Sequence, residues 1–275
     1  PPMEALGKPG HGSAGPSSPL LPGRPRTWLL LLLLYTLVAY LRVGTHDFIL
    51  FDDPFVYENE RIMHGVSWEG IQWAVTNTEY YDYWHPLPWL SHMLDFELFG
   101  SDPGMHHISS VFYHLLAVVA AYAALAMLTG RKWLALGATT LFALNPVHIE
   151  SIAWVVERKD VLSGLLFYLT LMAYAYYVRA RSVSRYLLVF LSYLLGLTAK
   201  PMLVTLPFLL LVIDYWRSMS RIHEAPRWWH RIGEKVPLFV VAAAAAVFTY
   251  VTVANKGAIQ STHAVPLLMR LQNAC

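Results

Sequence analysis

Two adjacent carboxylates, Asp52 and Asp53, are the first candidates for chemistry, because they lie in the one long polar segment between apolar runs. Neighbouring carboxylates repel each other, which raises the pKa of one of them and suits it to general-base work. The same pair could hold a divalent ion, or it could be a solvated turn before Pro54. The residues alone leave these interpretations open.

A second candidate group is the basic pair Arg158 and Lys159, in the short connection 145–160. An arginine fork or a lysine ammonium binds phosphate oxygens. The alternative is an ion-pair cluster with Glu157 and Asp160 that only ends a helix. Charge alone does not separate the two interpretations.

Lys200 is a third candidate, because it interrupts the apolar stretch 186–216 at Ala199-Lys200-Pro201. If this stretch is a hairpin, each arm spans only about 20–22 Å, so the turn lies at or below the boundary of the hydrocarbon. A lysine at that depth is costly without a partner, and it is therefore a functional candidate.

The histidines do not predict a zinc site. His85 and His92 lie seven residues apart, His106 and His107 are adjacent, and the chain has no H-E-x-x-H pattern. We predict no metal ligands from them.

His148 and Glu150 precede the basic pair and could orient it. The alternative for both residues is a polar helix terminus. Their spacing from Arg158 does not decide between these roles.

The composition is that of a membrane protein. Of the 275 residues, 56% are hydrophobic and 14% are charged, against about 25% charged residues in soluble domains. The mean hydropathy is +0.42. Cys275 is the only cysteine, which excludes a disulfide framework and a cysteine metal site. The chain has no P-loop motif and no basic aromatic surface for nucleic acid.

The order of apolar and polar segments predicts an all-α, multi-pass membrane bundle with a large first extracytoplasmic loop. Residues 42–107 hold 11 of the 18 acidic residues and two basic ones, Arg42 and Arg61. Basic residues favour the cytoplasmic side, and their placement makes 186–216 a hairpin and gives about seven spans in all. The predicted segments are a disordered tail at 1–26, a first membrane helix at 27–43, the loop at 44–107, the bundle at 108–255 and a truncated extracytoplasmic segment at 256–275.

Short interfacial helices are predicted inside the loop. Ser67 could cap a helix over 68–75, and residues 89–99 suit a helix lying in the membrane surface. Prolines at 86 and 88 predict an extended segment over 85–88. A cleaved signal peptide is the alternative for the first apolar run, although no suitable cleavage site follows it.

Several motifs in a fixed order resemble one family, the transmembrane and tetratricopeptide-repeat proteins, whose animal members are O-mannosyltransferases. The residues of these motifs resemble those of the bacterial relatives more closely, and the resemblance covers roughly residues 45–255. The motifs are Asp52-Asp53, Trp84-His85-Pro86-Leu87 with Trp89-Leu90-Ser91-His92, Asn145-Pro146-Val147-His148-Ile149-Glu150-Ser151, Glu157-Arg158-Lys159-Asp160 and Ala199-Lys200-Pro201.

The resemblance implies a GT-C type enzyme of the bacterial inner membrane or the ER membrane. Such an enzyme moves a sugar, a hexose such as mannose, from a polyprenyl-phosphate carrier to a protein or glycan at the periplasmic or lumenal face. It implies no firm cofactor, although a divalent cation would be compatible. The implied roles are catalytic for Asp52 and Asp53, carrier-phosphate-binding for Arg158, Lys159 and Lys200, and orienting for His85, His148, Glu150 and Asp160.

Two other functions stay open. A transporter needs a polar path through the bundle, but apart from Lys200 the charges lie at the ends of the spans. A membrane anchor for a missing tetratricopeptide-repeat domain explains the apolar helices but leaves the extracytoplasmic cations unexplained.

Overall fold

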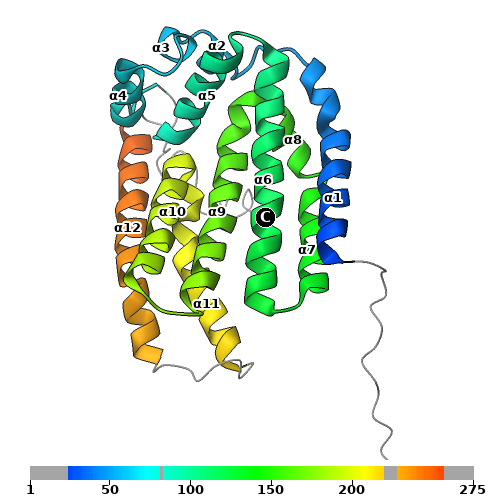
Figure 1. The fold of residues 1–275 in the computed structure, drawn as a ribbon. Helices are drawn as coiled ribbons and strands as arrows, with labels where there is room; N and C mark the ends of the chain where they lie inside the picture. Colours follow the sequence, from blue (N-terminus) through cyan, green and yellow to red (C-terminus); the bar gives the residue numbers. More distant parts are fainter. Residues whose placement is uncertain (1–23, 81–82, 220–227, 257–275) are drawn as a thin grey trace, which may run out of the picture.

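The computed structural model describes residues 24–80, 83–219 and 228–256. Within these ranges every regular element is a helix (Figure 1). Most of the predicted tail at 1–26 and nearly all of the segment at 256–275 lie outside the described residues.

Long helices run side by side along one axis and form a bundle (Figure 1). Among the described residues, four stretches are long and apolar enough to cross a membrane: Pro25–Thr45, Pro103–Thr129, Pro201–Met219 and Trp229–Asn255. Shorter or less apolar helices pack beside them. The bundle helices are α1 (Pro25–Tyr40), α6 (Pro103–Thr129), α7 (Lys132–Ala143), α9 (Arg158–Tyr177), α10 (Val183–Ala199), α11 (Leu206–Met219) and α12 (Trp228–Asn255).

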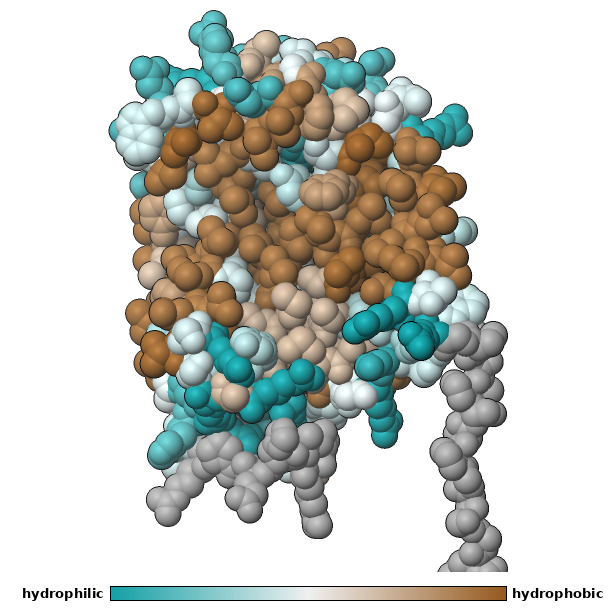
Figure 2. Space-filling model, viewed as in Figure 1, coloured by the Kyte–Doolittle hydropathy of each residue, from teal (hydrophilic) through white to brown (hydrophobic). Residues whose placement is uncertain are grey.

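A hydrophobic belt covers the middle of the face shown in Figure 2, and hydrophilic residues gather at both ends. Exposed apolar side chains such as Leu30, Leu141 and Val240 contribute to the lipid-facing surface of the bundle. A continuous apolar belt of this size needs lipid around it. The predicted helical membrane bundle is therefore confirmed.

The stretch 186–216 forms two helices, as predicted. Helix α10 ends at Ala199, and the 3-10 turn η3 (Pro201–Thr205) leads into α11. The hairpin is tight, because a Cβ on Gly196 would lie 2.4 Å from the Leu203 Cδ2. Lys200 therefore lies at the corner, where the last turn of α10 packs against η3.

The first loop folds into a small unit at one end of the bundle, which we call the loop end. Its elements are η1 (Leu41–Thr45), α2 (Pro54–Tyr57), α3 (Glu60–Met63), α4 (Trp68–Thr76) and α5 (Pro86–Phe99). The Ser67 hydroxyl accepts from the Gly70 N–H and caps α4, as the sequence predicts. The loop has its own apolar core, which includes Trp73, Trp89 and Val156.

The extended segment predicted over 85–88 is wrong beyond His85. Helix α5 begins at Pro86 and contains Pro88 in its first turn. Proline is favoured there because its missing N–H would have no helical partner. The rule that proline disfavours helix in the preceding residue applies to His85, which is the non-helical N-cap.

The chain between α7 and α9 is broken into short pieces, α8 (His148–Ala153) and η2 (Val155–Glu157). Figure 1 shows α8 beside α6, between the ends of the bundle. Irregular backbone at membrane depth is tolerated where it is buried in protein or lines a cavity.

Candidate active site at the loop end of the bundle

Asp53 joins the loop to the connection that precedes α9. Its carboxylate accepts from the Ile49 N–H at 2.8 Å and from the Val156 N–H at 3.1 Å. The side chain is fully buried, and this burial raises the pKa of the Asp53 carboxyl, although the two backbone N–H groups oppose the shift. The neighbouring Asp52 is partly exposed. Of the two predicted catalytic carboxylates, Asp52 is the one that solvent or a ligand can reach.

Arg158 is buried in an ion pair inside the protein. Its guanidinium lies 2.5 Å from the Asp95 carboxylate and donates to the His106 carbonyl at 2.6 Å and to the Ser110 hydroxyl at 3.2 Å. The residue is 0% exposed. These partners surround the guanidinium inside the protein, and the phosphate-binding role of Arg158 stays a prediction. Through these contacts Arg158 connects α9 with α5 and α6.

Lys159 is also largely buried, and its ammonium lies 2.6 Å from the Glu157 carboxylate. This is the ion pair that the sequence offered as the alternative to phosphate binding.

The positive charge of Lys159 acts on the nearby His85 ring. Burial, together with the positive charges of Lys159 and Lys256, lowers the pKa of His85 to about 4, although the contact with the Tyr83 carbonyl opposes the shift. The His85 ring packs on Trp89 with 4.5 Å between the ring centroids. His85 is therefore a neutral packing residue of the loop at physiological pH.

Lys200 and Asp160 form an ion pair that stays partly exposed. The side chains retain 25% and 29% of their accessible surface, in contrast to the buried Arg158. Asp160 also accepts from the Ser151 hydroxyl at 3.4 Å. The pair connects the corner of the α10–α11 hairpin with α9 and α8, and it remains open to a ligand.

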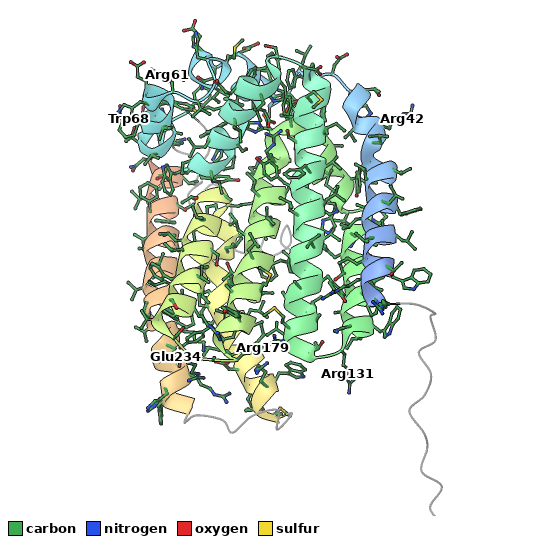
Figure 3. All side chains as sticks on the ribbon, in the orientation of Figure 1. Arg42, Arg61, Trp68, Arg131, Arg179 and Glu234 are labelled. Atoms are coloured by element: carbon green, nitrogen blue, oxygen red, sulfur yellow. The ribbon has the colours of Figure 1, made fainter. Side chains whose placement is uncertain are left out.

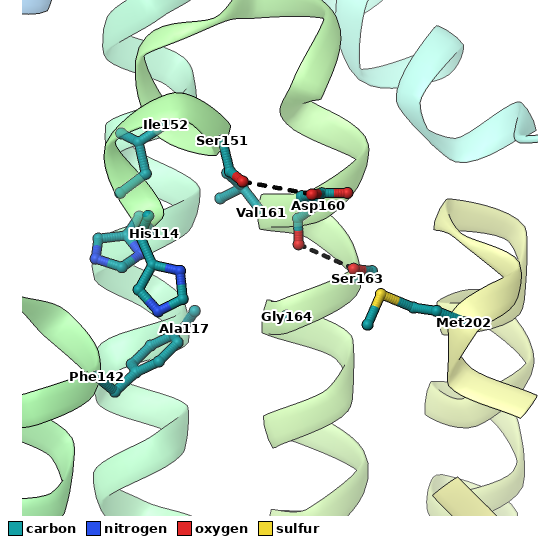
Figure 4. Close-up of a pocket in the computed structure, with 11 residues that line it drawn as sticks. His114, Ala117, Phe142, Ser151, Ile152, Asp160, Val161, Ser163, Gly164 and Met202 are labelled. Carbon is teal, nitrogen blue, oxygen red and sulfur yellow. Dashed lines mark hydrogen bonds between the residues drawn. The ribbon is translucent and has the colours of Figure 1, made fainter. Parts of the chain in front are cut away.

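A cavity of about 220 Å³ begins at Asp160 and lies among α6, α7, α8 and α9, with a few polar groups in an otherwise apolar lining (Figure 4). His148, one of the predicted orienting residues, lines it. Glu150 is exposed on α8 and does not line it. The lining residues are His114, Ala117, Phe142, His148, Ser151, Ile152, Asp160, Val161, Ser163, Gly164 and Met202.

An apolar groove of about 570 Å³ lies on the other side of the Lys200 corner. It runs among the end of α4, α10 and α12, and Pro201 is part of its wall. The remaining walls include Val75, Trp84, Leu197 and Phe248. The Lys200 corner therefore lies between this groove and the cavity that Asp160, His114 and His148 line.

His92, Asp95 and His106 form a buried set whose ligand atoms lie within 4.8 Å of one another. Imidazole and carboxylate are ligands of zinc and related ions. The guanidinium of Arg158 already pairs with Asp95, and its positive charge in the same buried space opposes a cation. The residues present do not fit a metal ion.

The sequence reasoning missed a second buried ion pair, between Asp214 of α11 and Lys235 of α12. The Tyr174 hydroxyl also donates to Asp214. The sequence does contain a signal for this pair. Asp214 follows the apolar run 206–213, and a carboxylate at membrane depth is costly unless it has a partner. Asp95, the partner of Arg158, carried no such signal among the many acids of the loop.

Together, the fold and these sites define a multi-pass helical membrane protein with a polar site at one end of its bundle. Among the described residues, Asp52, the Asp160–Lys200 pair and the cavity beside it are the parts of the predicted site that stay accessible.

Comparison with curated proteins confirms the resemblance to the TMTC-like family. The chain is 31% identical over 155 residues to "Protein O-mannosyl-transferase tmtc2" of Xenopus laevis, which covers 54% of this chain and 18% of that protein. The human TMTC2 is 27% identical over 155 residues, which are 54% of this chain and 18% of that protein. The mouse TMTC1 is 37% identical over 92 residues, 33% of this chain and 10% of that protein.

The chain thus spans less than a fifth of the length of these relatives. No family model and no solved structure matches it.

Proposed function

We propose that this chain forms the catalytic membrane region of a GT-C type glycosyltransferase. The enzyme moves a hexose, mannose in the first instance, from a polyprenyl-phosphate carrier to a hydroxyl of a protein or glycan. One observation carries the proposal: the partly exposed Asp160–Lys200 pair lies between an apolar groove and a smaller cavity to which Asp160, His114 and His148 contribute. The names of the relatives support mannose as the sugar.

The arrangement suits an amphiphilic donor. The apolar groove matches an isoprenoid chain, and its Pro201 wall adjoins Lys200. The Lys200 ammonium is then placed to stabilise the charge of the departing phosphate, and fixed charge of this kind is usually the largest catalytic contribution. Lys159 lies deeper and is paired with Glu157, so Lys200 is the better candidate for the carrier phosphate.

The reaction needs a base for the acceptor hydroxyl. The acceptor oxygen attacks the anomeric carbon while the bond from that carbon to the phosphate oxygen breaks. The phosphate leaves with the electron pair, and the hydroxyl proton passes to a carboxylate. We assign this carboxylate to Asp52, because Asp53 is buried and its oxygens already accept two backbone N–H groups.

The loop end is assigned to the periplasmic or lumenal side. Arg131 and Arg179 lie at the opposite end of the bundle (Figure 3), and basic residues favour the cytoplasmic side. The acceptor would then reach Asp52 from the extracytoplasmic space, in the inner membrane of a bacterium or in the ER membrane.

The test is transfer of mannose from polyprenyl-phosphate-mannose by the full-length protein, with acceptor peptides analysed by mass spectrometry. Asp52→Asn should lower transfer at least about 100-fold with normal membrane insertion. Asp53→Asn should lower both transfer and folding yield, because it weakens the anchor to Val156.

Glu69→Gln is the matched control, because it removes an exposed carboxylate of the same loop that lines neither the cavity nor the groove. Wild-type transfer by Asp52→Asn would refute the assignment of the base. Absence of a hexose increment on any acceptor would refute the proposed function.

A further inference from the structure

We propose that the cavity among α6, α7, α8 and α9 is the subsite for the sugar ring, and that it admits a single monosaccharide. This inference rests on the proposed function and assigns residues to sugar recognition. His114, His148 and Ser163 are the proposed hydroxyl-binding groups, and Phe142 is the apolar wall.

Several polar groups in the cavity are available to a ligand. The Nε2 of His114 lies 3.2 Å from the Ala143 carbonyl, which can only accept, so Nε2 carries the proton and Nδ1 is an acceptor. The Ser163 hydroxyl donates to the Asp160 carbonyl, and its oxygen keeps lone pairs for a second partner. His148 makes ring contacts with Phe142 and His114 and has no hydrogen-bond partner among the described residues.

This inventory is rich in acceptors, which matches a ligand that carries several hydroxyl donors. Figure 4 shows the His114 ring and Phe142 on one side of the cavity, with Asp160, Ser163 and Met202 across from them. A few convergent polar groups on an otherwise apolar lining are typical of a small-molecule site.

The size of the cavity limits the ligand. Its volume of about 220 Å³ is below the range of about 300–1,000 Å³ of ordinary ligand pockets. At about 30 Å³ for each water, the space corresponds to about seven waters, which is comparable to one hexose ring. A disaccharide or an isoprenoid chain does not fit.

The position of the cavity matches the order of groups in the donor. Asp160 lines the cavity and pairs with Lys200, and the apolar groove begins at Pro201. A donor with its chain in the groove and its phosphate at Lys200 therefore has its sugar at the mouth of the cavity. The broken segment between α7 and α9 is explained by the same arrangement, because it supplies His148 and Ser151 to the lining.

The test uses a glycine that opens into the cavity. A Cβ on Gly164 would meet nothing within 4 Å, so Gly164→Leu fills the cavity without a backbone clash. Gly137 of α7 also has open space around its Cβ and lies outside the cavity, so Gly137→Leu is the matched control. Binding of polyprenyl-phosphate-mannose and of sugar-free polyprenyl phosphate is measured with each protein in lipid nanodiscs.

The wild-type protein and Gly137→Leu should bind the mannosyl lipid about 10-fold tighter than the sugar-free lipid, the gain expected from two net hydrogen bonds. Gly164→Leu should bind both lipids with the affinity of the sugar-free one. Ser163→Ala and His148→Ala add no volume to the cavity. Each should lower the ratio of the affinity for the mannosyl lipid to that for the sugar-free lipid by about threefold to tenfold.

The outcomes separate the two proposals. If both lipids bind and Gly164→Leu leaves the sugar preference intact, the cavity is not the sugar subsite, while the proposed function stands. Equal affinity of the wild-type protein for the two lipids also overturns the subsite. If neither lipid binds, the proposed function fails, and the subsite fails with it. If Gly164→Leu lowers the thermal stability, the test rests on Ser163→Ala and His148→Ala. An unchanged sugar preference in both variants then overturns the subsite.

Discussion

The bundle contains two aspartate–lysine pairs whose surroundings differ. At the loop end, the Asp160 and Lys200 side chains keep 29% and 25% of their surface exposed, and a cavity opens beside them. Near the opposite end, the Asp214 and Lys235 side chains keep 4% and 1%. The same two residue types therefore occur once where a ligand can enter and once where it cannot.

The difference shows how burial divides structural from chemical roles. Around the buried pair, Arg231 donates to the Asp214 carbonyl at 2.6 Å and the Tyr174 hydroxyl donates to the Asp214 carboxylate. These groups connect α9, α11 and α12. A sealed and fully bonded pair stabilises one packing of the helices, whereas an open pair can exchange its partner for a phosphate.

The largest effect is expected at the buried pair. Asp214→Ala leaves the buried Lys235 with only Glu234, 3.5 Å away, as an acidic partner. The variant should therefore lower the free energy of unfolding by about 3 kcal/mol. Thermal unfolding in detergent measures the loss. The double variant Asp214→Leu with Lys235→Met is the control, and it should recover most of the stability because no unpaired charge remains. A loss below about 1 kcal/mol in Asp214→Ala would contradict the structural role.

Arg158→Met should cost about 3 kcal/mol, because Asp95 stays buried without its cation. The same thermal assay applies, with sugar-free polyprenyl phosphate binding as a second readout. Binding per folded molecule should be unchanged, since the Arg158 guanidinium is 0% exposed. Unchanged stability together with weakened lipid binding would support the phosphate-binding role for Arg158.

His85 should make the stability of the loop end depend on pH. Its pKa falls from an ordinary value near 6.5 to about 4 in the folded protein. The unfolded chain therefore binds a proton first as pH falls, so the contribution of His85 is complete above pH 6.5 and is lost toward pH 4. At about 1.4 kcal/mol for each pKa unit, this loss is about 3 kcal/mol at pH 4.

Melting curves between pH 7 and pH 4 test this prediction against His85→Gln, which cannot take up the proton. The variant should show a smaller decline than the wild-type protein. Parallel declines would mean that other groups carry the pH dependence.

The smallest effect on stability is expected at the open pair. Lys200→Ala should change the free energy of unfolding by less than about 1 kcal/mol, as for exposed ion pairs. Mannose transfer should nevertheless fall about 100-fold, because the leaving phosphate loses its cation. Lys256→Ala is a matched control, since it removes an exposed lysine at the end of α12. A large loss of stability with normal transfer per folded molecule would remove the contrast between the two pairs.

Much of the fold could be predicted from local signals. The Ser67 cap, the hairpin corner at Lys200 and the apolar spans depend on residues close together in the chain. The extended assignment of 85–88 failed because two proline rules compete there, and the helix start is favoured at Pro86. Local rules are least reliable where they make opposite predictions.

The candidate site was less predictable, because its outcome depends on contacts between distant residues. Charge patterning selected Arg158, but its partner Asp95 is 63 residues earlier and is one of 11 acids between positions 42 and 107. The cavity joins side chains from several helices, and His114 has no motif to mark it.

The sequence by itself determined that this chain crosses a membrane, where its polar loop falls and which residues carry charge, because hydropathy and charge are properties of short segments. Only the tertiary structure decided which charges are sealed and which stay open. Burial depends on how helices pack, and packing brings together residues whose separation along the chain contains no information about their distance in space.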